Sequence, residues 1–505
     1  MPLVDVISRP SYSPAPMNVT VNAKSAFSQP SPVVVLYAFQ NERPALPVAL
    51  RNLLRRLTTK EFNGTDSQLL LLHSSGKPSR LLLVGLGQRT EFTLEKLRRA
   101  TGTAIKKLRA AGLDRATVHL NLPTDDALFT VVEAAELALY KFTEFQVETP
   151  GEFKTLTICL PAGSDLPVAR QIVHRAQVTA RAASYARALA NLPPNIITPA
   201  TLADRARQLA DEVGLTCQIL DKAALKEKNF GGILAVGGGS ANEPRLIILE
   251  YRGGPADQQP FALVGKAITF DTGGISLKHA DRMEDMKFDK CGGCAVLGIM
   301  RGVAELQLPV NVLAIIAAAE NMPSSTSYRP SDIVTSYRGK DKRAVTIEVI
   351  NTDAEGRIVL GDAITYARER GAQAIVDFAT LTGACVVALG NHAAGLFSNH
   401  AGFSETLRAA GERTGERCWP LPLWQEYRDA IKSEVADHKN TGGREGGAIT
   451  AAAFIEKYAQ TTPWIHLDIA GTAYSGKEKP YLAPGATGFG VRLLLHVLGS
   501  WRGTV

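Results

Sequence analysis

Four acidic side chains in the middle of the chain lie at or just after short apolar segments. Asp271 ends VGKAITFD, Asp289 ends MKFD, and Asp353 and Glu355 lie in INTDAEGR. If these carboxylates converge, they repel one another unless cations lie between them. Hard divalent cations prefer oxygen ligands, and two-metal hydrolytic sites hold their ions about 3.5–4 Å apart. The spacing alone leaves two readings open: a metal site, or structural carboxylates and helix caps at strand ends.

Basic side chains accompany these carboxylates, namely Lys266, Lys278 and Arg357. Side chains at alternate positions of an extended segment project from the same side. We therefore expect Asp353, Glu355 and Arg357 to face the same way along INTDAEGR. The nine histidines include no HExxH pair, so the common zinc-protease signature is absent.

The elements that must position these residues form a large α/β unit. Apolar runs predict strands at 245–251, 261–270, 311–320, 345–353, 374–383 and 464–471. Because the runs are continuous rather than alternating, we expect helices on both faces of a mixed, mostly parallel sheet. Thr198-Pro199 predicts the start of a helix, since proline is favourable at a first helical position. GGILAVGGGS at 231–240 reads as strand and turn.

A smaller α/β region precedes this unit. Apolar runs at 31–39 and 80–87 predict buried strands, and leucines and alanines recur at helical spacing from Thr93 to Gly112. Thr93 is the expected N-cap of that amphipathic helix. Its exposed faces are predicted to carry six cations: Lys96, Arg98, Arg99, Lys106, Lys107 and Arg109.

The expected domain order follows from these elements. Residues 1–16, rich in Ser and Pro, are expected to be a disordered tail. Residues 17–166 form the N-terminal α/β domain, and 167–192 form a connecting helix that Pro193-Pro194 ends. The larger α/β domain, which contains the acidic residues, takes residues 193–505. The fold class is therefore α/β with two domains.

Composition narrows the setting of the protein. The six cysteines are widely spaced, the first thirty residues lack an apolar signal core, and no apolar run approaches the ~20 residues of a membrane span. We expect a cytoplasmic protein without membrane contact. Cys291 and Cys294 form a CxxC, but no second pair accompanies it, so buried structural thiols are expected rather than a zinc or redox site.

The positive charge is concentrated in the first part of the chain. Residues 1–190 carry 23 Lys and Arg against 15 Asp and Glu, a net +8, whereas the rest carries 33 against 34. A solvated basic surface explains this, and so does a patch for an anionic partner such as DNA. Both interpretations stay open.

The motifs around the acidic residues resemble those of the leucine aminopeptidase family. The resemblance rests on VGKAITFDTGGISLK, MKFD, AAAENMPSSTSYRPSD, NTDAEGR, ATLTGA and HLDIAGTA, in that order, over roughly residues 185–500. One short motif would be unspecific, but the ordered set is specific. Two features depart from the family pattern: Lys290, where many members have Met, and a longer connection at 339–349.

The resemblance implies a site for two divalent metal ions, Mn or Zn. In the family, the counterparts of Asp271 and Glu355 bridge both metals. The counterpart of Asp353 binds the first, more exchangeable ion, and those of Lys266 and Asp289 bind the second. A lysine ligand must be a neutral amine, and an adjacent cation can lower its pKa sufficiently.

The resemblance also implies the catalytic groups. Lys278 matches a cation that stabilises the reacting carbonyl oxygen, and Arg357 matches one that holds bicarbonate as the general base. The pocket for the first side chain of the substrate would be lined by Met286, Thr380, Gly383, Ala470 and Ala473. This apolar lining suits Leu-like residues at the amino end of peptide substrates.

The family resemblance further implies a homohexamer acting in intracellular peptide turnover, and some members also bind DNA. A nucleic-acid-binding accessory protein and a catalytically retired scaffold are the alternatives from other classes. The complete set of matched ligand and catalytic residues argues against the scaffold.

Overall fold

In a computed structural model of the chain, residues 17–42, 47, 48, 50, 51, 58–122, 124–147 and 151–503 are described. The chain divides into two compact units. The smaller comprises the chain up to Ser184 together with Lys477–Pro484, and the larger comprises the remainder. The division thus falls inside one helix, α5 (Leu166–Asn191), instead of at residues 166 and 192, and the predicted tail 1–16 lies outside the described residues.

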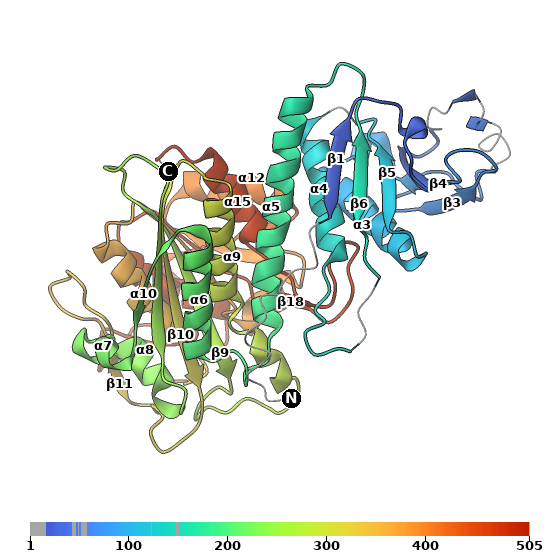
Figure 1. The fold of residues 1–505 in the computed structure, drawn as a ribbon. Helices are drawn as coiled ribbons and strands as arrows, with labels where there is room; N and C mark the ends of the chain where they lie inside the picture. Colours follow the sequence, from blue (N-terminus) through green and yellow to red (C-terminus); the bar gives the residue numbers. More distant parts are fainter. Residues whose placement is uncertain are drawn as a thin grey trace. The chain divides into compact units, whose positions relative to one another are not determined.

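The smaller unit is built on a six-stranded sheet in the order β1-β6-β5-β2-β4-β3 (Figure 1). Its strands are β1 (Asn18–Asn22), β2 (Val33–Ala38), β3 (Leu69–His73), β4 (Arg80–Gly85), β5 (Arg115–His119) and β6 (Thr155–Cys159). The helices α3 (Leu94–Ala110) and α4 (Asp125–Leu139) accompany the sheet. The predicted strands at 31–39 and 80–87 are confirmed, and so is Thr93 as N-cap, since its Oγ1 accepts the N–H of Lys96 at 3.2 Å.

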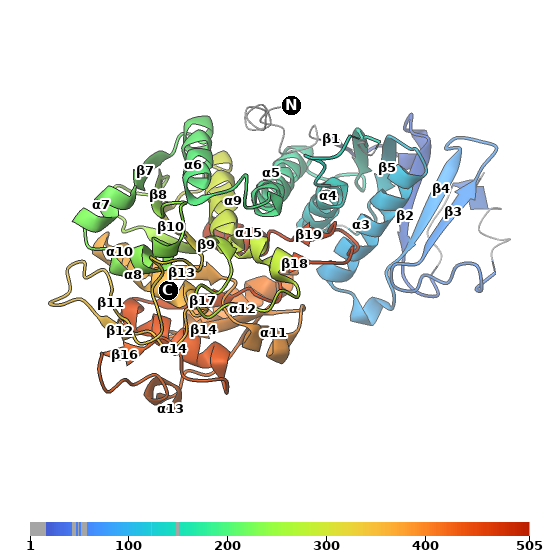
Figure 2. The same ribbon diagram turned by 90° about the horizontal axis from the view of Figure 1, so that it is seen from below.

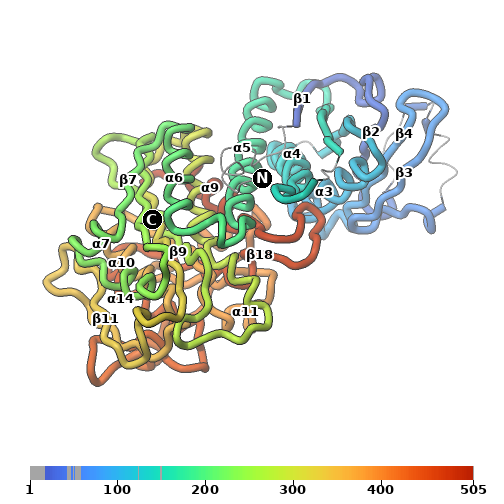
Figure 3. Tube along the Cα trace, turned by 60° about the horizontal axis from the view of Figure 1, so that its bottom comes forward, coloured from blue at the N-terminus to red at the C-terminus, as the bar shows by residue number. Residues whose placement is uncertain are grey.

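The expectation that α3 exposes six cations is wrong. Arg98 is buried, and its Nε donates to Glu133 on α4 at 2.8 Å. Lys106 is partly buried and donates to backbone carbonyls of the loop 477–484, which lies beside α3 (Figure 3). Of the six cations, only Arg99 and Lys107 are exposed. Residues from distant parts of the chain therefore contact cationic side chains that the helical pattern predicts to be exposed to solvent.

The larger unit contains an eight-stranded mixed sheet in the order β15-β14-β17-β13-β9-β10-β8-β7. The strands are β7 (Thr216–Leu220), β8 (Arg245–Arg252), β9 (Phe261–Asp271), β10 (Asn311–Asn321), β13 (Ala374–Ala379), β14 (Ala394–Ser398), β15 (Cys418–Pro420) and β17 (Trp464–Asp468). The four neighbours β17, β13, β9 and β10 are parallel, so their carboxyl ends meet at one edge. The predicted two-domain α/β fold with a mixed sheet is confirmed.

Helices cover both faces of this sheet, as the continuous apolar strands predict. Figure 2 shows α6 (Pro199–Val213), α9 (Cys291–Glu305) and α15 (Val491–Ser500) on one face, and α8 (Gly231–Val236), α10 (Gly356–Glu369) and α14 (Gly447–Ala459) on the other. Strands buried on both sides have no solvent face to keep polar. Within the described ranges, no helix has the length and apolarity needed to cross a membrane.

Two local predictions for the larger unit are wrong. Of the run 345–353, only β12 (Thr346–Glu348) is a strand, and it lies in a separate small sheet with β11 (Ile333–Thr335) and β16 (His438–Lys439). The segment 231–240 begins with helix α8 instead of a strand, because the buried carboxylate of Asp362 accepts the N–H of Ile233 at 3.0 Å. Because Asp362 lies 129 residues after Ile233, the local sequence does not reveal this contact.

Candidate metal centre

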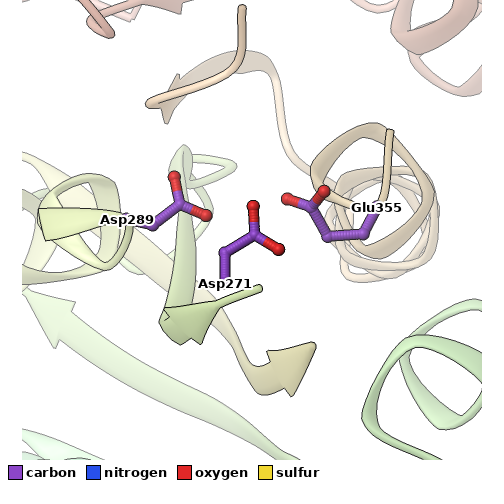
Figure 4. A group of neighbouring side chains, drawn as sticks. All are labelled: Asp271, Asp289 and Glu355. Atoms are coloured by element: carbon purple, nitrogen blue, oxygen red, sulfur yellow. The ribbon is translucent and has the colours of Figure 1, made fainter. Parts of the chain in front are cut away.

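Three buried carboxylates converge at the edge where the parallel strands end. Asp271 is the last residue of β9, Asp289 follows the 3₁₀ turn Met283–Phe288, and Glu355 immediately precedes α10. One oxygen from each lies within 4.8 Å of the others, and all three residues are buried. Their carboxylates point toward a common space, with Asp271 between the other two (Figure 4). This is the geometry that a metal site requires.

A tight turn after β9 returns the chain to Asp271. Gly273 has φ +86°, a conformation that glycine adopts readily, and a Cβ there would lie 2.5 Å from the carbonyl oxygen of Ser276. Lys278 then donates its backbone N–H to Thr272 at 2.9 Å. Its ammonium group lies 2.8 Å from Asp271 Oδ2 and also contacts Asp353.

Lys266 reaches the carboxylates from the middle of β9. Its Nζ lies 2.7 Å from Glu355 and 2.9 Å from Asp289, and it donates to the carbonyl of Thr380 at 2.9 Å. Gly356 makes room for this side chain, since a Cβ at that position would lie 2.8 Å from Lys266 Cδ, Cε and Nζ. The side chain of Lys266 thus explains sterically why glycine fits at this position of NTDAEGR.

Burial and the proximity of other carboxylates raise the pKa of three acidic side chains at the site. Burial and then the charge of Asp271 raise the pKa of Glu355 to about 7 and that of Asp353 to about 6. Burial also raises the pKa of Asp289. For Lys266, burial lowers the pKa, but the neighbouring carboxylates outweigh it and the net change is upward. The site therefore concentrates negative charge that cations stabilise.

Arg357 is buried in the first turn of α10. Its Nη1 donates to the backbone carbonyl of Asn440 at 2.8 Å, and its Nε has no hydrogen-bond partner among the described residues. Burial lowers the pKa of Arg357 to about 10. The alternation expected for INTDAEGR is wrong, because Asp353 lies in a turn and Glu355 has helical backbone angles.

The five residues expected to line a substrate pocket lie on three segments. Thr380 donates to Asp289 Oδ1 at 2.5 Å, which joins this segment to the carboxylates. Gly383 is exposed at the start of α11 (Gly383–Leu389), and Ala470 is partly buried after β17. Met286 is partly buried in the turn Met283–Phe288, and Ala473 is buried before β18 (Tyr474–Ser475).

Three buried polar residues that support the site were not predicted. Asp468 accepts the N–H groups of Leu381 at 3.2 Å and Ala470 at 3.1 Å, and so joins two of the segments that are expected to line the pocket. Asn321, at the end of β10, donates to Asp271 at 2.9 Å and to the carbonyl of Thr352 at 3.0 Å. The third is Asn440. The only sequence feature that could have indicated them is the position of Asp468 and Asn321 at the ends of predicted strands.

The two departures noted in the sequence do not contact the carboxylates. Lys290 is buried, its Nζ donates to the carbonyls of Leu192 (2.9 Å) and Lys287, and burial lowers its pKa to about 8. The segment 339–349 comprises the end of the connection from β11 to β12 and β12 itself, and Arg343 pairs with Asp437 there. The CxxC thiols are buried, and burial raises the pKa of Cys294 to about 12, in keeping with structural thiols.

Comparison with known proteins gives consistent matches. The catalytic-domain model of the cytosol aminopeptidase family matches residues 184–495, and the N-terminal-domain model of that family matches 42–149. The probable cytosol aminopeptidase of Cenarchaeum symbiosum is 49% identical over 444 residues, covering 86% of this chain and 89% of the relative. That of Roseiflexus castenholzii is 45% identical over 496 residues, covering 96% and 99%.

Among solved structures, the bottromycin maturation enzyme BotP is similar with a TM-score of 0.82 and 32% identity, over 93% of this chain and 99% of that one. A second structure of the same enzyme is in complex with Mn and gives the same values.

Proposed function

The chain belongs to the cytosol aminopeptidase family, and from this premise we propose that it is a metal-dependent enzyme acting at Asp271, Asp289 and Glu355. As a member of a peptidase family, it is a hydrolase that releases amino-terminal residues from peptides. The observation that carries the proposal is the convergence of the three buried carboxylates within 4.8 Å.

The residues present fit two divalent cations. Asp271 and Glu355 are the proposed bridging ligands, Asp353 the ligand of the first ion, and Lys266 and Asp289 those of the second. Lys266 has Nζ within 2.9 Å of two carboxylates, so a cation held among them would favour its neutral amine. The chemistry that such a pair of cations supplies is activation of water and stabilisation of negative charge on the carbonyl oxygen.

The remaining groups act around that centre. Lys278, whose Nζ is 2.8 Å from Asp271, brings positive charge to the place where the carbonyl oxygen becomes negative. Arg357 is proposed to hold bicarbonate as the general base. Its buried Nε, which has no hydrogen-bond partner in the described part of the chain, supports this role, because a buried donor gains most from an anion that accepts its hydrogen bond.

We propose a preference for Leu-like residues. The proposed pocket of Met286, Thr380, Gly383, Ala470 and Ala473 would offer mostly small or apolar side chains, which would leave room for a branched aliphatic group. Manganese or zinc as the metal, a cytoplasmic site of peptide turnover and assembly as a homohexamer complete the proposal. Size-exclusion chromatography with light scattering tests the assembly.

The decisive experiment removes and restores the metal. Hydrolysis of Leu-p-nitroanilide should disappear after chelation and dialysis, and return on adding Mn²⁺ or Zn²⁺, with about two ions per chain measured by elemental analysis at full activity. Full activity of protein that retains less than one ion per chain would contradict a dinuclear site.

DNA binding through the smaller unit is a second candidate function. The net charge of +8 in residues 1–190 favours it, but of the six α3 cations only Arg99 and Lys107 are fully exposed. A gel-shift titration should therefore compare wild type with Arg99→Glu/Lys107→Glu, at low and physiological salt. No shift of duplex DNA by wild type at low salt removes this function. Equal binding by the double variant places the contact elsewhere.

A further inference from the structure

We infer that Asn440 is a positioning residue for the acidic loop 350–355 and for Arg357. The inference rests on the proposed function, because it concerns how the proposed ligands and the proposed anion-binding arginine are held. Asn440 is fully buried, with 0% exposure, and directly follows β16. Because β16 runs parallel to β12, Asn440 lies beside the chain that leaves β12 toward Asp353.

One side-chain amide serves four backbone groups of the loop. Its Oδ1 accepts the N–H groups of Ile350 at 2.8 Å and Asn351 at 3.3 Å. Its Nδ2 donates to the carbonyls of Asn351 at 2.7 Å and Ala354 at 3.3 Å. The loop has no regular secondary structure until α10 begins, so these bonds replace the ladder that a strand would supply.

The backbone of Asn440 fixes a second part of the site. Its N–H donates to the carbonyl of Glu348 at 3.0 Å, which ties it to β12. Its own carbonyl accepts Nη1 of Arg357 at 2.8 Å. Asn440 thus joins the loop that carries Asp353 and Glu355 to the arginine that follows them, although it lies more than eighty residues later in the chain.

Asparagine is specifically suited to this role. An aspartate has the same size but only accepts hydrogen bonds, so it would face the two carbonyls that Nδ2 now serves. A serine would keep at most part of the network. Buried groups left without partners favour rearrangement of the loop.

The test compares Asn440→Asp with the matched variant Asn311→Asp. Asn311 is also buried and has the same kind of contacts: its Nδ2 donates to Pro255 (2.7 Å) and Gln258 (3.0 Å), and its Oδ1 accepts from Gly254 (3.1 Å). It begins β10, at the opposite end of the strand from Asn321. Both variants should lose thermal stability, which controls for the loss of a buried amide.

Only Asn440→Asp should lose turnover. We expect kcat to fall about 10²-fold, the effect of displacing catalytic groups by about 1 Å. KM should change little, because Asp468 holds two of the proposed pocket segments separately. An equal fall of kcat in both variants, or wild-type kcat in Asn440→Asp, overturns the inference. If Asn440→Asp does not fold, Asn440→Ser decides: a reduced kcat supports the inference, and a wild-type kcat overturns it. A wild type without metal-dependent cleavage overturns instead the proposed function on which the inference rests.

Discussion

Replacing Gly356 by alanine should separate helix stability from activity. Gly356 is the first residue of α10, where alanine is intrinsically the better helix former by up to about 1 kcal/mol. From local propensity alone, the variant should be at least as stable as wild type. The structure indicates a different outcome, because the added methyl group meets Lys266.

The size of the effect follows from the contacts of Lys266. The new Cβ would lie 2.8 Å from three side-chain atoms of Lys266, so these must move by roughly 0.6 Å to reach ordinary contact at 3.4 Å. Lys266 is buried, and its Nζ already contacts Asp289, Glu355 and the carbonyl of Thr380. A displacement of this order breaks at least one contact. Misplacement by about 1 Å can cost 10²-fold in rate, or about 2.7 kcal/mol of transition-state stabilisation.

The assay measures three quantities on the same preparation: kcat for Leu-p-nitroanilide, bound metal and the unfolding temperature. Gly499→Ala is the matched control, since Gly499 also lies in a helix, α15, and nothing is within 4 Å of its added Cβ. The control should keep full activity. Gly356→Ala should lose most of its activity and part of its metal while remaining folded. Wild-type turnover with full metal content would refute the assignment of Lys266 to the metal centre.

Three further predictions address the same site. Glu355→Gln should abolish activity and lower metal content, because an amide cannot bridge two cations, and full turnover with both metals bound would contradict the assignment. Lys278→Ala should keep both metals but lose ~10²–10³ in turnover, whereas Lys432→Ala, which removes an exposed ion pair with Asp429, should be neutral. N-acetylated peptides should not be cleaved, since the free amine is proposed to bind at the metals, and their efficient hydrolysis would argue against exopeptidase action.

The strands of the larger unit were predictable because burial on both faces leaves a strong local signal. Runs such as 261–270 and 311–320 are mostly apolar, with only two polar residues each, and both form central strands. In the run 345–353 only Val345, Ile347, Val349 and Ile350 are apolar, and only the three residues Thr346–Glu348 form a strand. Its lower apolar content already sets it apart from the strands of the large sheet, and its pairing with β16 depends on residues far along the chain that no local pattern contains.

Among the polar and charged residues, too, some positions were predictable from the sequence and others were not. The converging carboxylates of the candidate metal centre were found from motifs, whereas the polar groups that hold them were not. Asp468 acts on Thr382 across 86 positions, and Asn440 acts on Ala354 across 86 positions, so no window of sequence contains both partners. Arg98 shows the reverse error: its helical face indicates solvent, but Glu133, 35 residues later, draws it into the interior. Polar burial depends on such distant partners.

The charge balance of the site explains why its base should be an external anion. Asp271, Asp289, Asp353 and Glu355 face three cationic side chains, and in this environment the pKa of Glu355 rises to about 7. Without metal, the carboxylates outnumber the cationic side chains, so the site has net negative charge. Two divalent cations with a neutral Lys266 would make the net charge positive, and every one of these carboxylates would then bind a metal. None would then be free to accept the proton of the attacking water. A centre with net positive charge attracts anions, and Arg357, in the first turn of α10, has a buried Nε with no hydrogen-bond partner among the described residues. If bicarbonate is the base, a variant with a new carboxylate side chain near Arg357 should be able to take over its role. Changing one of the proposed metal ligands should not have this effect.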